Sequence, residues 1–128
     1  MKEVYEAYAQ GAELLSGGIG ACRQAIPIGF HRYWIDYFQH TLFTIIYDSL
    51  FDKILAYKFQ ENDTADNALS ILAHNKMVIY PFISEPVSFE NSDTIQNHIE
   101  ENNLIREYFD YAKNQFKTIE QVSKLNNQ

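Results

Sequence analysis

Asp36 and His40 are the two residues whose types and spacing best suit chemistry in this chain of 128 residues. On a helix, residues four apart project from the same face, so a carboxylate and an imidazole could share a proton or a metal ion. His74 and His98 could complete such a site. Helical two-metal sites, however, use Glu-x-x-His motifs, and the sequence contains none. We therefore interpret Asp36 and His40 as a structural hydrogen-bonded pair, and keep a metal-dependent enzyme as an alternative.

Cys22 is the single cysteine of the chain. One cysteine excludes an internal disulfide, and with it a disulfide-stapled secreted scaffold. The preceding SGGIG stretch, residues 16–20, lacks the Lys-Ser/Thr pair of a phosphate-binding loop, so we interpret it as a helix break. Cys22 is then a packing residue. The sequence predicts no catalytic residue, no metal and no cofactor, and hence a protein that is not an enzyme.

The charge of the chain is acidic and evenly spread. The net charge is −7, and the ten Lys and Arg residues are scattered along the sequence. Binding to a nucleic-acid backbone or to an anionic membrane surface requires clustered basic residues. We therefore exclude nucleic acid as a partner and expect other protein subunits instead.

The segment 29–51, GFHRYWIDYFQHTLFTIIYDSLF, must position Asp36 and His40. Apolar residues at helical spacing fall on two overlapping stripes, which is typical of a helix surrounded by others. We therefore predict a long central helix over residues 30–59. The first stripe consists of Trp34, Phe38, Leu42, Ile45 and Ser49, and the second of Phe43, Ile46, Leu50, Ile54 and Tyr57.

The same segment does not suit a membrane. A spanning helix needs about 20 predominantly apolar residues. Residues 30–51 include nine polar or charged ones, and Asp36 and Asp48 are too far apart for both to lie at one membrane edge. We predict no direct membrane span. Membership of a membrane-associated complex stays compatible with the sequence.

Three further helices are expected around the central one. Apolar spacing predicts a helix over residues 3–15, another from Asp63 or Thr64 to about Tyr80, and a last one from about Asp93 onward. Two prolines mark residues 80–93 as an extended connector. The predicted fold is all-α: one helical domain spanning residues 1–128, a bundle of about four helices with a long central helix.

The 9 Tyr and 9 Phe residues exceed what a four-helix core needs. Because aromatic side chains dominate protein interfaces, we interpret part of them as contacts. The leading hypothesis is a non-enzymatic helical accessory or structural subunit of a larger assembly. The alternative is a small acidic regulatory or inhibitory protein, of the phage or plasmid kind, that binds one target protein. The predicted partner-binding residues are Tyr5, Tyr8, Tyr33, Trp34, Tyr108 and Tyr111.

The start of the chain bears on its location. It shows neither a secretory signal nor an Arg-rich presequence. We expect an intracellular, reducing compartment, and a mitochondrial complex fits this expectation as well.

Overall fold

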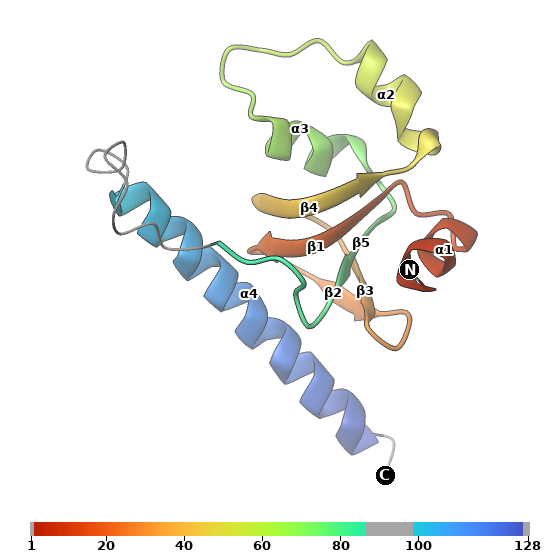
Figure 1. Ribbon diagram of the computed structural model, residues 1–128, viewed down its shortest axis with the longest axis vertical. Coiled ribbons are helices and arrows are strands. Elements are labelled where there is room, and N and C mark those ends of the chain that lie inside the picture. Colours follow the sequence, from red (N-terminus) through yellow and green to blue (C-terminus); the bar gives the residue numbers. More distant parts are fainter. Residues whose placement is uncertain (1, 87–98, 127–128) are drawn as a thin grey trace.

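The computed structural model describes residues 2–86 and 99–126 and shows a mixed α/β fold (Figure 1). The all-α prediction is therefore wrong. A five-stranded sheet forms the centre, and the long helix α4 packs on it. The elements are α1 (Lys2–Ala9), β1 (Leu14–Gly20), β2 (Ala25–Pro27), β3 (Arg32–Ile35), β4 (His40–Ile46), the 3-10 turn η1 (Asp48–Leu50), α2 (Phe51–Ala56), α3 (Ala65–Leu72), β5 (Lys76–Ile79) and α4 (Ile99–Asn126).

The strands follow the order β2-β3-β5-β1-β4. The β1–β5 pair is parallel, with Leu15 opposite Met77, and the other three pairs are antiparallel. A parallel pair needs a crossover connection. Here the chain between β1 and β5 comprises β2, β3, β4, α2 and α3. The short β2 lies at one edge of the sheet, and β4 lies at the other.

The predicted central helix over residues 30–59 is replaced by β3, β4, η1 and α2. Strands that are covered on both faces carry near-continuous apolar runs, which resemble a buried helix when only spacing is counted. The β-branched and aromatic residues of RYWI and HTLFTII fit a pleated sheet better than a helix. Apolar spacing alone favours a helix in this segment, whereas its β-branched and aromatic content favours strands.

The SGGIG stretch is part of β1, so its interpretation as a helix break is wrong. Every residue of β1 is buried. A Cβ atom on Gly18 would lie 2.1 Å from the carbonyl oxygen of Ser84, and one on Gly20 would lie 3.3 Å from the Phe109 ring. The glycines therefore serve close approach of other chain segments to the strand.

The sheet has a core on each face. Successive side chains of a strand point to opposite faces of the sheet. Leu14 and Val78 therefore lie in the core on one face, and Leu15 and Met77 lie in the core on the other. The larger core lies beneath α3 and α4, and the smaller lies beneath α1. The larger core contains Leu14, Ile19, Cys22, Tyr33, Ile35, Phe38, Leu50, Ala73, Val78, Ala112 and Phe116, and the smaller contains Ala7, Ala12, Leu15, Tyr47 and Met77.

Arg32 ties α1 to the sheet. Its side chain is 1% exposed, and its guanidinium donates hydrogen bonds to Glu3 and Glu6 at 2.9 Å and to Gln10 at 2.6 Å. The bond from Arg32 lowers the pKa of the Glu6 carboxyl. A helix of eight residues has little stability alone, so these contacts and the packing of Ala7 hold it in place.

The predicted helix over residues 3–15 is too long, since α1 ends at Ala9 and β1 begins at Leu14, whereas the predicted start of the next helix at Asp63 or Thr64 is confirmed. Thr64 caps α3, since its hydroxyl oxygen accepts a hydrogen bond from the Asn67 amide at 3.2 Å. That helix ends at Leu72, however, and β5 follows where the prediction continued the helix to Tyr80. Residues 80–86 run beside β1, where the amides of Ile83 and Ser84 donate to the Gly17 carbonyl. The predicted start of the last helix near Asp93 lies outside the described residues.

We predict that Gly18→Ala lowers the free energy of unfolding by at least about 2 kcal/mol, because the new Cβ would meet backbone that cannot move independently. Gly17→Ala is the matched control: its Cβ would meet the side chain of the exposed Ile83, which can rotate away. Urea denaturation measures both. Equal losses in the two variants would contradict the close-approach explanation.

We also predict that Arg32→Ala lowers the free energy of unfolding by about 3 kcal/mol, because it removes a fully buried side chain and leaves the carboxylates of Glu3 and Glu6 and the exposed Gln10 amide without their partner. Arg106→Ala, at an exposed position on α4, should cost less than about 0.5 kcal/mol. Chemical denaturation compares the two variants. An Arg32→Ala protein as stable as Arg106→Ala would show that α1 is held by its apolar contacts alone.

Candidate binding groove

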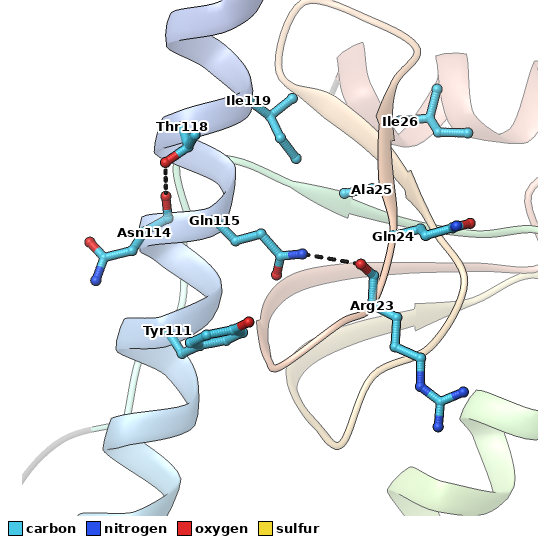
Figure 2. Close-up of a pocket in the computed structure, with 9 residues that line it drawn as sticks. All are labelled: Arg23, Gln24, Ala25, Ile26, Tyr111, Asn114, Gln115, Thr118 and Ile119. Atoms are coloured by element: carbon cyan, nitrogen blue, oxygen red, sulfur yellow. Dashed lines mark hydrogen bonds between the residues drawn. The ribbon is translucent and has the colours of Figure 1, made fainter.

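A groove of about 720 Å³ lies between the edge strand β2 and α4 (Figure 2). Loop residues before β2 form one wall, and one side of α4 forms the other. The lining carries amide, hydroxyl, phenol and guanidinium groups and three aliphatic side chains. The nine lining residues are Arg23, Gln24, Ala25, Ile26, Tyr111, Asn114, Gln115, Thr118 and Ile119.

Gln115 joins the two walls of the groove. Its amide nitrogen donates to the Arg23 carbonyl at 3.3 Å, and its amide oxygen accepts from the Cys22 thiol at 3.4 Å. The loop is also tied to α4 by the Ala21 amide, which donates to the Tyr108 carbonyl at 3.3 Å. Ala21 has φ 44°, an unusual conformation for alanine that turns the chain out of β1. These contacts set the separation of the walls.

Asp36 holds the conformation of the loop before β2. Its carboxylate accepts hydrogen bonds from the amides of Arg23 and Gln24, at 3.3 and 2.9 Å. The Arg23 guanidinium lies 5.2 Å from the centre of the Tyr37 ring, within the range of a cation–π contact. Of the nine described residues that line the groove, Arg23 carries the only full charge.

The outer edge of β2 exposes a few backbone groups. The Ile28 amide donates to the Arg32 carbonyl, and the Gln24 carbonyl accepts from the Asp36 amide, so these residues direct their backbone groups toward β3. By alternation, the amide of Ala25 and the carbonyls of Ala25 and Pro27 point away from the sheet. Pro27 has no amide hydrogen, so only a short contact with another chain can form here.

Helix α4 has two apolar faces. Phe109, Ala112 and Phe116 are buried on the sheet. A second stripe, which we call the free stripe, follows heptad spacing beside the groove and includes polar positions. Its large apolar members other than Tyr108 are between 49% and 68% exposed. The free stripe comprises Leu104, Tyr108, Tyr111, Gln115, Thr118, Val122 and Leu125.

A second hollow, of about 400 Å³, lies on the α1 side of the sheet and includes Trp34, Ile28 and Met77. Ile26 borders both hollows. Trp34 and Tyr111, two of the predicted contact residues, therefore belong to one surface that wraps around β2. Their contact with a partner stays a prediction.

The other predicted contact residues are dispersed. Tyr5 and Tyr8 are exposed on α1, away from the groove lining. Tyr108 is partly buried, with its ring centre 5.7 Å from that of His40. Tyr33 is a core residue, and the centre of its ring lies 5.0 Å from the centre of the Phe116 ring in an edge-to-face arrangement. The structure thus brings Trp34 and Tyr111 onto one surface and places Tyr33 in the interior.

Among the described residues of the enzymatic alternative, Asp36, His40 and His74 do not gather at one site, and His98 lies outside the described residues. His40 borders a hollow with Tyr37, Tyr108 and Asp66, whereas Asp36 binds the loop before β2 and the exposed His74 precedes β5. In the part of the chain that the structure describes, no group of three or more His, Cys, Asp or Glu side chains could hold a metal ion. Within the same part, no helix combines the length and apolarity needed to cross a membrane.

Sequence reasoning missed Gln115, Arg23 and Ile26 as groove residues. Arg23 precedes the edge strand β2 and Ile26 lies within it, and residue spacing gives no signal for an edge strand of three residues. The heptad spacing of Leu104, Tyr111 and Leu125 was a usable signal, since a helix with two apolar stripes has more than one contact surface.

No protein-family model, curated protein or solved structure matches this chain.

Cys22 should be unreactive in the folded protein. Burial, with a contribution from the negative charge of Asp36, raises its pKa from 9.0 to about 12. At pH 8 this lowers the thiolate fraction from about one in ten to about one in ten thousand. We predict that iodoacetamide labels the native thiol at least about 100-fold more slowly than the urea-unfolded chain.

Thr118→Cys in a Cys22→Ser background is the control, because it places a thiol at an exposed position of the same groove. It should react at the rate of a free cysteine. If native Cys22 were labelled as fast as this control, the thiol would be accessible through the groove and the assignment as a packing residue would fail.

Proposed function

We propose that this protein acts by binding another protein, as a non-enzymatic accessory or structural subunit, through the surface formed by β2 and the free stripe of α4. The observation that carries the proposal is the exposure of large apolar residues along the free stripe, directly beside a groove. Exposed apolar clusters of this kind in folded proteins are common sites of protein association.

The chemistry of the groove supports a polypeptide as the ligand. Gln24, Asn114 and Gln115 supply amide groups, which can both donate to and accept from a peptide backbone. The outward amide and carbonyl of Ala25 offer the same pairing at the strand edge. Tyr111 adds an aromatic ring with a polar end, the combination that is enriched at interface hot spots.

A second candidate function rests on α2. Phe51 and Leu55 are exposed and lie four residues apart on this helix, so they form one apolar ridge. Asp48 and Asp52 are exposed beside it. An apolar ridge flanked by carboxylates suits a cationic target, and this favours the acidic inhibitory protein as the alternative reading.

Affinity capture with the tagged protein, from an extract of the organism that encodes it, tests the proposal. The groove variant is Tyr111→Glu/Val122→Glu, which places two charges on the free stripe. The matched control is Leu55→Glu, on the exposed face of α2. We expect the groove variant to reduce recovery of the bound partner at least about tenfold, because hot-spot residues dominate interface energies. The control should leave recovery unchanged.

Circular dichroism and urea denaturation establish that each variant is folded. Equal recovery by wild type and groove variant would contradict the proposal. Loss of the partner with Leu55→Glu alone would instead select the α2 face and the inhibitory function. Hydrogen exchange of the isolated complex gives an independent measurement, in which the proposal expects added protection at residues 23–26 and 111–122.

A further inference from the structure

We propose that a hollow formed by β4, α3 and α4 binds a small neutral sugar. The hollow has a volume of about 350 Å³ and shares no lining residue with the groove, so this inference goes beyond the proposed function. Residues 37–40 form one side, the first turn of α3, which lies beside β4 (Figure 1), forms the second, and α4 forms the third. The lining includes Tyr37, Gln39, His40, Asp66, Asn67 and Tyr108.

No described residue satisfies the polar ends of these six side chains. None of the six forms a side-chain hydrogen bond or an ion pair within the part of the chain that the structure describes. All except Asn67 are partly buried. Polar groups that are partly shielded from water and lack a partner in the fold gain most from a ligand that supplies one.

Backbone contacts fix the walls of the hollow before any ligand binds. The Gln39 amide donates to the Gly20 carbonyl at 3.1 Å. The Phe38 amide donates to the Ser70 hydroxyl at 3.0 Å, which ties residues 37–40 to α3. A Cβ atom on Gly20 would lie 3.2 Å from the His40 ring, so this ring packs against a bare position of β1. A preformed site of this kind loses little conformational entropy on binding.

The charges around the hollow disfavour an ionic ligand. Asp66 repels anions such as phosphate, and no Lys or Arg is among the lining residues that the structure describes. Cations are disfavoured by the positive end of α3, whose first turn holds Asp66. The Arg23 guanidinium, 5.2 Å from the centre of the Tyr37 ring, opposes cations as well. A neutral ligand is therefore the best electrostatic match.

The rings of the hollow do not form a slot for a flat base. The centres of the His40 and Tyr108 rings lie 5.7 Å apart and their planes are inclined by 40°, so the two rings contact each other and no third ring fits between them. The Arg23 guanidinium already lies over the Tyr37 ring. A nucleobase held between two parallel rings is therefore disfavoured, whereas a sugar needs only one ring against its C–H groups.

The hydrogen-bonding groups match those of a sugar. Each sugar hydroxyl can both donate and accept, and so can the side-chain amides of Gln39 and Asn67. The Asp66 carboxylate can accept from two neighbouring hydroxyls, and such charge-assisted bonds are strong. A volume of about 350 Å³ is near the lower end of the range for small-molecule sites, which suits a monosaccharide or a disaccharide.

Saturation-transfer NMR tests the inference with a panel of neutral hexoses, pentoses and their disaccharides. Each is added at up to about 10 mM, where complexes of millimolar affinity populate. Nucleosides and polyamines form the comparison panel. We expect saturation transfer to at least one sugar, together with chemical-shift changes at the backbone amides of residues 37–40 and 64–67. No transfer to any sugar, or transfer to the comparison panel alone, would overturn the inference.

Variants locate the bound sugar. Asp66→Asn should raise its dissociation constant at least about tenfold, because it removes a charged acceptor and keeps the size of the side chain. Gln39→Ala should raise it about threefold, because it removes an uncharged amide. The matched control is Asp52→Asn, which removes an exposed carboxylate from the first turn of α2 and should leave the dissociation constant unchanged. Circular dichroism establishes that each variant is folded. Binding of wild-type strength by Asp66→Asn would show that the sugar lies elsewhere.

The sugar site and the proposed function are tested separately. Tyr111→Glu/Val122→Glu changes residues outside the hollow, so it should bind the sugar as wild type does whether or not it captures the protein partner. Loss of sugar binding in this folded variant would place the sugar in the groove and would overturn its assignment to the hollow.

Discussion

The close approach of other chain segments to β1 is the constraint on which the rest of the structure depends. At Gly18 the Ser84 carbonyl occupies the space of a Cβ atom, and at Gly20 a Cβ atom would be in tight contact with Tyr108 and Phe109 of α4. Without Gly18 the segment after β5 could not run beside β1 as it does, and without Gly20 α4 would have to shift outward by a few tenths of an ångström. Since α4 forms one wall of the groove, the bare surface of the central strand helps to set the position of the candidate site.

Buried ionisable groups fix the connections around this centre. Glu13 accepts hydrogen bonds from the amides of His74 and Asn75 and from the Lys53 ammonium, at 2.9, 3.0 and 2.6 Å. Burial alone would raise the pKa of Glu13, but these donors outweigh burial and lower it. Lys76 donates to the Ala73 carbonyl, and burial lowers its pKa although Asp36 and Glu13 oppose the shift. Each group joins the turn before β5 to the rest of the fold. Its directional hydrogen bonds fix the orientation of this turn, which apolar contacts alone could not do.

The sequence predicted the elements that depend on local signals and missed those that depend on pairing. Thr64 before an apolar run predicted the start of α3, and apolar spacing predicted a helix at the end of the chain, where α4 lies. Strand pairing leaves no such local signal: β1 pairs with residues 20 to 32 positions away in β4 and 62 positions away in β5. Tyr111 and Trp34 were predicted as contacts from residue type alone. That they lie on one surface around β2 follows from the sheet order, which residue spacing could not reveal.

Pro27 at the free edge of the sheet has a consequence for colloidal behaviour. An exposed strand edge is a template on which identical chains can stack without limit, the route to fibrils. Here the edge strand is three residues long and ends in a residue that cannot continue a hydrogen-bonded ladder. The β2 edge of the sheet therefore disfavours unlimited stacking of identical chains through its backbone groups.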